Sequence, residues 1–327
     1  MTRRKPPPPD DTARDIAKAR RLAIVSIVYL CSTVTLLFIV TSGSQALKTE
    51  FVGDALSIIP PLLFLVGNRI SGRAPDSRHP YGYERAVSAG YLGAALVLLL
   101  TGLFLFFDSA MKLVRAEHPS IGGLPLFGHV VWIGWLGLAV LLYSSVPAFF
   151  LGRAEKKLGE KLHDKTLIAD AQVNEADWQS AGAAMLGVVG IAFGLWWADA
   201  AAALFISFEI IRDGITELRS ALGDIMDRRP QQLAGKEPDP LPQKLCDYLR
   251  GQDWVSDAIV RVREVGREFV AEAFVVPAAV GPDLVERIAE ASRGAREIDR
   301  RLRDVVIAPL PEFNPGLEAI RPRSPAG

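Results

Sequence analysis

Cysteine is scarce in this sequence of 327 residues, and neither sign of charge is in excess. The 2 cysteines, Cys31 and Cys246, exclude a disulfide framework and a cysteine-rich zinc module. Lysine and arginine together number 37, as do aspartate and glutamate, which argues against a nucleic-acid binder with a dominant basic surface. The sequence also lacks a glycine-rich phosphate loop, a nucleophile–base pairing and a histidine-rich metal motif, so no motif indicates an enzyme.

Apolar residues are abundant: 50% of the chain is hydrophobic, 23% is charged, and the mean hydropathy is +0.21. That charged fraction is ordinary for a soluble protein, whereas a positive mean hydropathy is not. Both values hold together only if polarity is unevenly distributed along the chain. We therefore predict a membrane part and a soluble part, with the boundary near residue 215.

Six apolar segments precede this boundary, and a membrane span needs about 20 such residues. They cover about residues 22–41, 46–70, 86–107, 130–151, 168–193 and 196–211. The amino-terminal arm and the segments after the second and fourth spans hold most of the flanking lysine and arginine. The positive-inside rule then places both termini in the cytoplasm. We predict an integral protein of a bacterial-type inner (plasma) membrane.

The carboxy-terminal part has the pattern of a small α+β domain. Helices are expected over 241–250 and 283–298, and strands over 258–265, 268–276 and 302–308, with a turn at Gly266-Arg267. The predicted fold class is a mostly α membrane protein: a six-helix transmembrane bundle with a cytoplasmic, ferredoxin-like αββαβ domain. The predicted divisions are a disordered amino-terminal arm (1–20), the transmembrane domain (21–215), a helical linker (216–240), the cytoplasmic domain (241–310) and a disordered tail (311–327).

Two columns of oxygen-bearing side chains share a four-then-three spacing within the second and fifth spans. They are Glu50, Asp54 and Ser57, and Asp170, Asn174 and Asp177. Such positions fall on one side of a helix. Ionisable groups in spans are costly and by default mark an ion path. If the two columns face each other, they can cage one divalent cation. Solvation at the membrane boundary is the alternative for any single carboxylate, and Glu175 falls off the shared side.

Several motifs in order resemble the cation diffusion facilitator family of divalent-metal transporters, over about residues 20–310. They are Ser42-Gly43-Ser44, the loop His79-Pro80-Tyr81-Gly82-Tyr83, Ala169-Asp170-Ala171 followed by Asp177, and Met226-Asp227-Arg228. The resemblance implies a transport site of paired ligands, four residues apart, on the second and fifth spans. It also implies a secondary metal site near the second–third loop, where Asp76 and His79 match and Tyr83 stands where a histidine is often found.

The chain departs from the family pattern in the fifth span. Asp177 fits the downstream ligand of the pair, but Val173 occupies the upstream position and cannot ligate a metal. Either Asn174 or Asp170 replaces it, or the site is altered. The predicted metal ligands are Glu50, Asp54, Asp170, Asn174 and Asp177, with Asp76 and His79 as a secondary site.

The resemblance implies a dimeric secondary transporter that exports a divalent metal from the cytoplasm in exchange for protons. The expected partners are the metal ion, protons, a second copy of the chain and membrane lipids, with no nucleic acid and no fixed cofactor. Carboxylate and amide oxygens favour Mn²⁺ or Fe²⁺ over Zn²⁺ as cargo, without excluding zinc. The cytoplasmic domain has no histidine and only Cys246, which argues against a rich zinc site there, and the resemblance implies dimer contact as its role. Val173 motivates the alternative, a non-transporting membrane metal sensor or scaffold with a degenerate site.

Overall fold

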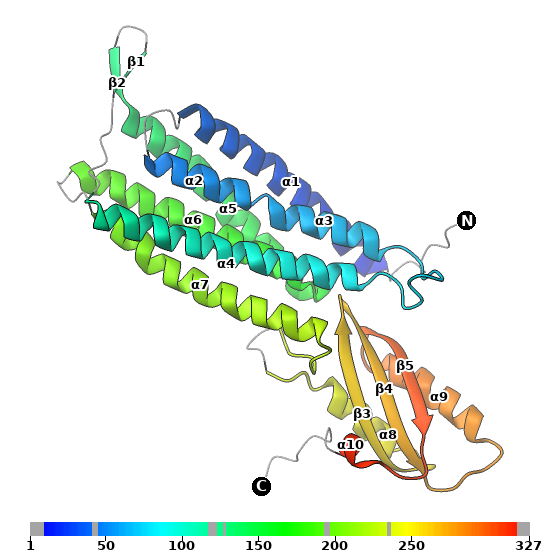
Figure 1. Cartoon of the computed structure of the whole chain (residues 1–327). Helices are drawn as coiled ribbons and strands as arrows, with labels where there is room; N and C mark the ends of the chain where they lie inside the picture. The colour runs from blue at the N-terminus through cyan, green and yellow to red at the C-terminus, as the bar shows by residue number, and fades with distance from the viewer. Residues whose placement is uncertain are drawn as a thin grey trace. The chain divides into compact units, whose positions relative to one another are not determined.

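The computed structural model describes residues 10–40, 45–116, 123–126, 129–192, 197–233 and 237–318. The chain divides into two compact units, Met1–Leu222 and Gly223–Gly327. The first is mainly helical and the second contains a three-stranded sheet (Figure 1). The first unit ends at Leu222, seven residues after the predicted boundary at residue 215.

A helix occupies the position of every predicted span in the first unit (Figure 1). These helices are α1 (Asp10–Val40), α2 (Gln45–Leu56), α3 (Ile59–Ser71), α4 (Arg85–Val114), α5 (Ile133–Leu162), α6 (Lys165–Ala192) and α7 (Ala198–Ile225). Within the described residues, four stretches are long and apolar enough to cross a membrane: Asp11–Ile39, Phe51–Ser71, Arg85–Val114 and Leu138–Leu162. The count of six spans stays a prediction.

The second predicted span, residues 46–70, is two consecutive helices rather than one. Pro60 and Pro61 occupy the first turn of α3, where their missing N–H groups cost nothing but prevent a continuous helix through Ser57. The Ser57 N–H still donates to the Gly53 carbonyl at 3.0 Å, so the break begins just after it. A polar residue therefore stands at an interruption inside an apolar segment.

The predicted disordered arm over residues 1–20 is wrong for residues 10–20, because α1 begins at Asp10. Ala19 packs with Phe64 and Leu162 in a buried apolar cluster. Asp15 is buried beside Lys161, 2.6 Å from its ammonium nitrogen. These contacts hold the amino-terminal turns of α1 against the other helices. The polar composition of residues 10–20 does not predict such contacts. Residues 1–9 lie outside the described part of the chain.

The fourth predicted span also needs correction. Residues 129–132 form strand β2 (His129–Trp132), paired with β1 (Gly123–Leu126), and α5 continues from Ile133 to Leu162. The basic stretch 153–161, expected in a loop, is therefore helical. Apart from Gly159 it consists of lysine, glutamate, arginine, alanine and leucine, which are strong helix formers.

The second unit has the predicted αββαβ order. Its elements are α8 (Leu241–Arg250), β3 (Val255–Val265), β4 (Glu268–Pro277), α9 (Leu284–Glu297) and β5 (Leu302–Pro309). β4 is the central strand, antiparallel to β3 and parallel to β5. The β3–β4 turn contains Gly266 at φ 65°, a conformation that glycine adopts at little cost. Residues from both helices and all three strands share one apolar core, including Leu245, Ala295 and Phe269.

Two boundaries around this unit differ from the prediction. Residues 216–225 continue α7 rather than forming a separate linker helix. In the predicted disordered tail, 311–327, a short helix α10 (Pro315–Glu318) forms because Leu317 is buried. Residues 319–327 lie outside the described part of the chain.

Arg301 is predicted to hold the second unit together. Its guanidinium lies 4.5 Å from the centre of the Phe269 ring and 2.9 Å from the buried Asp239, which also caps α8 by accepting the Leu241 N–H. Arg301→Met leaves the Asp239 carboxylate buried without its cation and should lower the free energy of unfolding of this unit by about 3 kcal/mol. Hydrogen exchange of β4 and β5 amides in the full chain measures the loss. The exposed Arg293→Met is the control, and equal protection in both variants would contradict the assignment.

Candidate functional site

Helices α5 and α6 form a tight antiparallel hairpin that positions the acidic side chains of the helical unit. Asp164 precedes α6, and its carboxylate accepts the N–H groups of Thr166 at 2.9 Å and Leu167 at 3.2 Å. This is an N-terminal cap, which satisfies backbone donors that a helix start leaves unpaired. The cap fixes where α6 begins and therefore the depth of Asp170, five residues further on.

Two glycines on α5 let the backbones of the hairpin approach each other. A Cβ at Gly152 would lie 3.1 Å from the Asn174 Cβ and 3.2 Å from the Ala171 carbonyl oxygen. A Cβ at Gly159 would lie 2.8 Å from the Ile168 side chain. The glycines are seven residues apart and thus on one side of α5. Glu155 lies between them on that side, so it points at α6.

The first site group joins α2 to α6. The Ser57 hydroxyl donates to Asp177 Oδ1 at 2.9 Å, and it also lies 3.1 Å from the Gly53 carbonyl oxygen. Asp54, one turn before Ser57, is 4% exposed and hydrogen-bonds to Thr33 of α1. Its Oδ2 atom has no hydrogen-bond partner among the described residues. The two columns predicted from spacing therefore meet at Ser57 and Asp177.

The second group lies nearer the start of α6. Asn174 donates its amide to Glu155 Oε2 at 2.8 Å, and the Ser26 hydroxyl of α1 donates to Glu155 Oε1 at 2.7 Å. Asp170 lies within electrostatic range of Glu155. Asp170 Oδ2 and Asn174 Oδ1 are buried and lack hydrogen-bond partners within the described ranges. Two of the predicted ligands, Asp170 and Asn174, thus belong to the group around Glu155 and not to the group around Ser57.

The two groups occupy different depths in the bundle. Asp170 and Asp177 are seven residues apart on α6, which corresponds to about 10 Å along the helix. No group of three or more His, Cys, Asp or Glu side chains in metal-binding geometry occurs in the part of the chain that is described. Glu50 belongs to α2, but its side chain lies outside the described residues.

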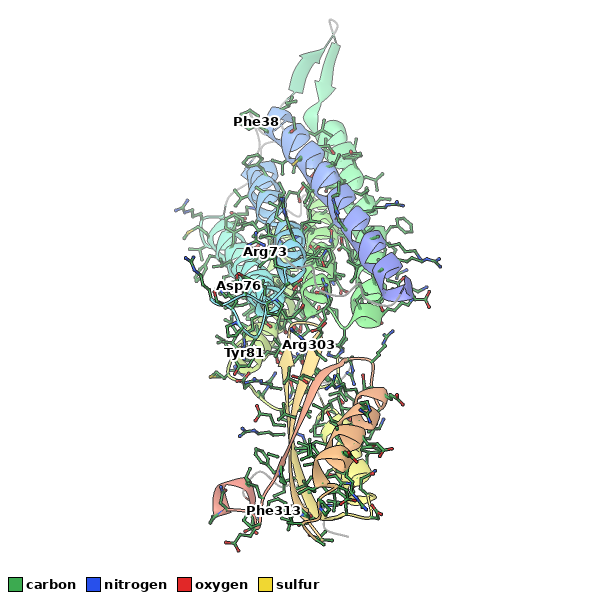
Figure 2. The ribbon with its side chains drawn as sticks, turned by 90° about the vertical axis from the view of Figure 1, so that its right-hand side faces the viewer. Phe38, Arg73, Asp76, Tyr81, Arg303 and Phe313 are labelled. Atoms are coloured by element: carbon green, nitrogen blue, oxygen red, sulfur yellow. The ribbon has the colours of Figure 1, made fainter. Side chains whose placement is uncertain are left out.

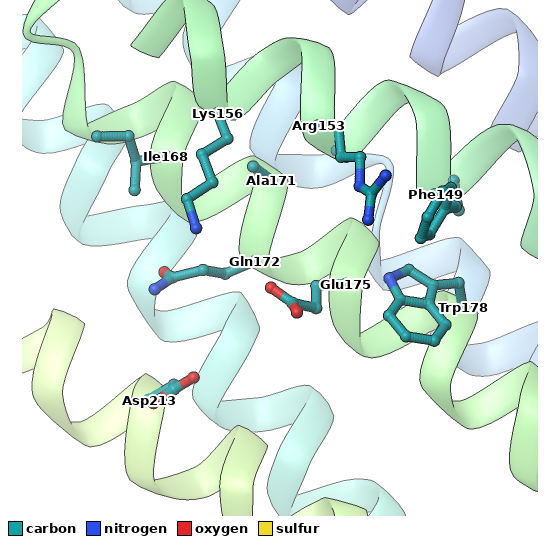
Figure 3. Close-up of a pocket in the computed structure, with 11 residues that line it drawn as sticks. Phe149, Arg153, Lys156, Ile168, Ala171, Gln172, Glu175, Trp178 and Asp213 are labelled. Carbon is teal, nitrogen blue, oxygen red and sulfur yellow. The ribbon is translucent and has the colours of Figure 1, made fainter. Parts of the chain in front are cut away.

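Val173 and Glu175 both lie outside these polar groups. Val173 packs in an apolar cluster with Val97 and Ile210, so α6 turns an apolar side toward α4 and α7 at this position. Glu175 is exposed, as its position off the shared side predicts. It lines a groove of about 400 Å³, in which Figure 3 shows the basic side chains of Arg153 and Lys156.

Sequence reasoning missed Glu155 and three polar residues of α1. Glu155 is completely buried, although it sits in a run of charged residues that reads as a loop. The sequence feature that could have predicted its burial is the pair of glycines, Gly152 and Gly159, which lie at helical spacing on either side of it. On α1, Ser26, Tyr29 and Thr33 share one side of the apolar segment that follows Arg21. Ser26 and Thr33 hydrogen-bond to Glu155 and Asp54, respectively, and Tyr29 lies in electrostatic range of Asp54 and Asp177.

The predicted secondary site lies in the exposed loop between α3 and α4, where Figure 2 labels Asp76. The structure brings Asp76 and His79 together, with 3.4 Å between Oδ1 and Nδ1. Asp76 also accepts the N–H groups of Arg78 and His79 and the Tyr83 hydroxyl, the last at 2.7 Å. The Tyr83 hydrogen bond is the main cause that holds the pKa of the Asp76 carboxyl below its usual value. This carboxylate is thus already used to shape the loop.

Comparison with known proteins identifies the family. A family model described as the cation efflux transmembrane domain matches residues 22–226, which is more than half of the chain. The chain belongs to the cation diffusion facilitator family. The manganese efflux system protein MneS of Bacillus subtilis is 24% identical to this transporter over 295 residues, covering 89% of this chain and 92% of that protein.

Two further relatives come from other organisms. The magnetosome protein MamB of Paramagnetospirillum magneticum is 25% identical over 273 residues, covering 81% of this chain and 82% of its own. Metal tolerance protein C1 of Arabidopsis thaliana is 24% identical over 228 residues, covering 64% of this chain and 46% of its own. Membership of the cation diffusion facilitator family identifies a transmembrane cation transporter and not an enzyme, which confirms both predictions.

Ser57 is predicted to orient the Asp177 carboxylate of this transporter. Ser57→Ala removes the hydroxyl that donates to Asp177 and should weaken metal binding by roughly 10- to 100-fold, as the loss of a group that orients a ligand does. Equilibrium dialysis of the purified full chain with Mn²⁺ provides the measurement. Ser77→Ala, in the exposed α3–α4 loop, is the matched control. Equal affinity in both variants would contradict this role.

Tyr83 is predicted to tune the carboxyl of the loop. Tyr83→Phe removes the hydrogen bond that most strongly favours ionised Asp76, so the pKa of Asp76 should rise toward its ordinary value. A lowered folded-state pKa stabilises the loop above the unfolded-state pKa, and this contribution disappears as pH falls through the folded-state pKa. Infrared titration of the full chain, referenced to Asp76→Asn, follows the carboxyl. Tyr81→Phe in the same loop should leave the titration unchanged, and an unchanged Tyr83→Phe titration would refute the assignment.

Proposed function

We propose that this transporter exports a divalent metal ion from the cytoplasm in exchange for protons. The observation that carries the proposal is the Ser57–Asp177 hydrogen bond, which joins the acidic side of α6 to the break between α2 and α3. Asp54 and Asp177 then supply carboxylates from two different helices. A cation between them offsets the cost of keeping ionised carboxylates away from water.

Proton exchange follows from the ligand chemistry. Carboxylate oxygens bind either a metal ion or protons, so the two compete for Asp54 and Asp177. In the proposed cycle, metal loads from the cytoplasm, and protonation on the other side releases it. Asp170 and Asn174 are proposed to take part on the cytoplasmic side, and Glu50 as an additional α2 ligand. Lysine and arginine near the helix ends support the proposed orientation with both termini in the cytoplasm.

Manganese is the proposed first cargo, with ferrous iron next and zinc third. The described polar groups offer carboxylate, amide and hydroxyl oxygens, which suit hard divalent ions. Relatives include proteins named for manganese efflux, MneS and MneP of Bacillus subtilis. We further propose that the protein acts as a homodimer in a bacterial-type inner membrane.

Proteoliposome uptake tests the proposal. Vesicles loaded at low pH and diluted into Mn²⁺ at higher pH should accumulate the ion, and an uncoupler should abolish the uptake. Asp54→Asn and Asp177→Asn each remove one ionised ligand and should reduce uptake at least about tenfold. Glu175→Gln, an exposed carboxylate on the same helix as Asp177, should transport normally.

The competing function is a metal sensor or scaffold, motivated by Val173 at the expected ligand position. Under that alternative the wild type binds Mn²⁺ without transporting it. Uptake of Mn²⁺, Fe²⁺, Co²⁺ and Zn²⁺ is therefore compared with binding in the same preparations. Wild-type uptake that equals that of Asp54→Asn and Asp177→Asn for every metal would refute the transport proposal.

A further inference from the structure

Glu155 is a fully buried carboxylate of the helical unit, at 0% exposure, and the proposed transport site does not use it. Its two oxygens each accept one hydrogen bond, from Ser26 and from Asn174. Two donors aimed at both oxygens of one carboxyl group leave both oxygens acting as acceptors. Glu155 therefore presents two acceptor oxygens deep in the bundle.

Asp170 adds a second acidic group at the same depth. It is 1% exposed, and the ionisable groups that act on it electrostatically, Glu155, Asp177 and Asp164, are all acidic. The Asp170 Oδ2 atom is buried and accepts no hydrogen bond from any described residue. Two carboxyl groups enclosed in this way call for a compensating cation.

Asn174 places a buried amide group beside these carboxyl groups. Its amide nitrogen faces two acceptors, Glu155 Oε2 at 2.8 Å and the Asp170 carbonyl oxygen at 3.3 Å. The amide must therefore point its oxygen the other way, and this Oδ1 atom is buried and accepts no hydrogen bond from the described residues. Asn174 is 2% exposed, so water reaches this oxygen poorly.

We infer that Glu155, Asp170, Asn174 and Ser26 form a second binding station for a divalent cation, separate from the one at Asp54 and Asp177. The inference rests on the proposed function, since it gives the same cargo a second place to bind. Two carboxylates and one hydroxyl supply oxygen ligands, and the Asn174 amide would add a fourth oxygen by turning over when an ion binds; such a set suits Mn²⁺ or Mg²⁺ better than zinc.

The two stations are spaced consistently along two helices. On α1, Ser26 belongs to the Glu155 station, and Thr33 interacts with Asp54 of the other station. On α6, Asp170 belongs to the Glu155 station and Asp177 to the other. Each pair is seven residues apart, or about 10 Å. The Glu155 station lies toward the amino-terminal ends of α1 and α6, the side predicted to face the cytoplasm. An ion moving outward would meet it before Asp54 and Asp177.

The number of Mn²⁺ ions bound to the full chain in nanodiscs tests the inference. Glu155→Gln keeps the size of the side chain and should bind one Mn²⁺ fewer per protomer than wild type. The double variant Asp54→Asn/Asp177→Asn should lose a different ion, so that combining all three substitutions removes both. Glu160→Gln, an exposed carboxylate on the same helix, should bind Mn²⁺ like wild type.

Asp170→Asn serves as a second variant, because it leaves the Ser26–Glu155–Asn174 hydrogen bonds in place should Glu155→Gln fail to fold. It should also cost one bound Mn²⁺. Unchanged Mn²⁺ binding by folded Glu155→Gln or Asp170→Asn overturns the station, and so does loss of all binding in Asp54→Asn/Asp177→Asn. Wild-type uptake in proteoliposomes, measured in parallel, tests the proposed function separately: two bound ions without uptake refute transport and leave the station standing.

Discussion

Burial of carboxyl groups away from water is the constraint on which the helical unit depends. An enclosed ionised carboxylate is costly unless hydrogen bonds or an opposite charge compensate it. Here the compensation comes from short polar side chains on neighbouring helices, Ser26 and Asn174 for Glu155 and Ser57 for Asp177. The polar side of α1 is therefore part of the site, although most residues after Arg21 in this helix are apolar.

Close helix packing makes these short hydrogen bonds reachable. A serine or asparagine side chain extends only a few bonds from its backbone, so helices that carry such partners must lie close together. Gly152 and Gly159 allow that approach between α5 and α6, and Glu155 lies between them. The break after Ser57 has a related effect, since it places a hydroxyl opposite Asp177 where a straight helix would run on.

Much of the fold was predictable because it depends on local patterns. Apolar length predicted the positions of the helices, and alternation with the Gly266 turn predicted the strands of the second unit. The errors share a cause. The amino-terminal turns and the basic end of α5 look solvated by composition, but Asp15 and Lys161 pair with each other there. They are 146 residues apart in the sequence, a separation that a local window does not span.

The site was predictable only in part, and the reason is physical. Helical spacing determined which residues of one helix share a side, so Asp54 with Ser57 and Asp170 with Asp177 followed from the sequence. Which helices meet, and at what depth, is decided by packing between segments far apart in the chain. Only the tertiary structure could join Glu155 to Ser26 and divide the predicted ligands into two groups, because those contacts depend on the approach of separate helices.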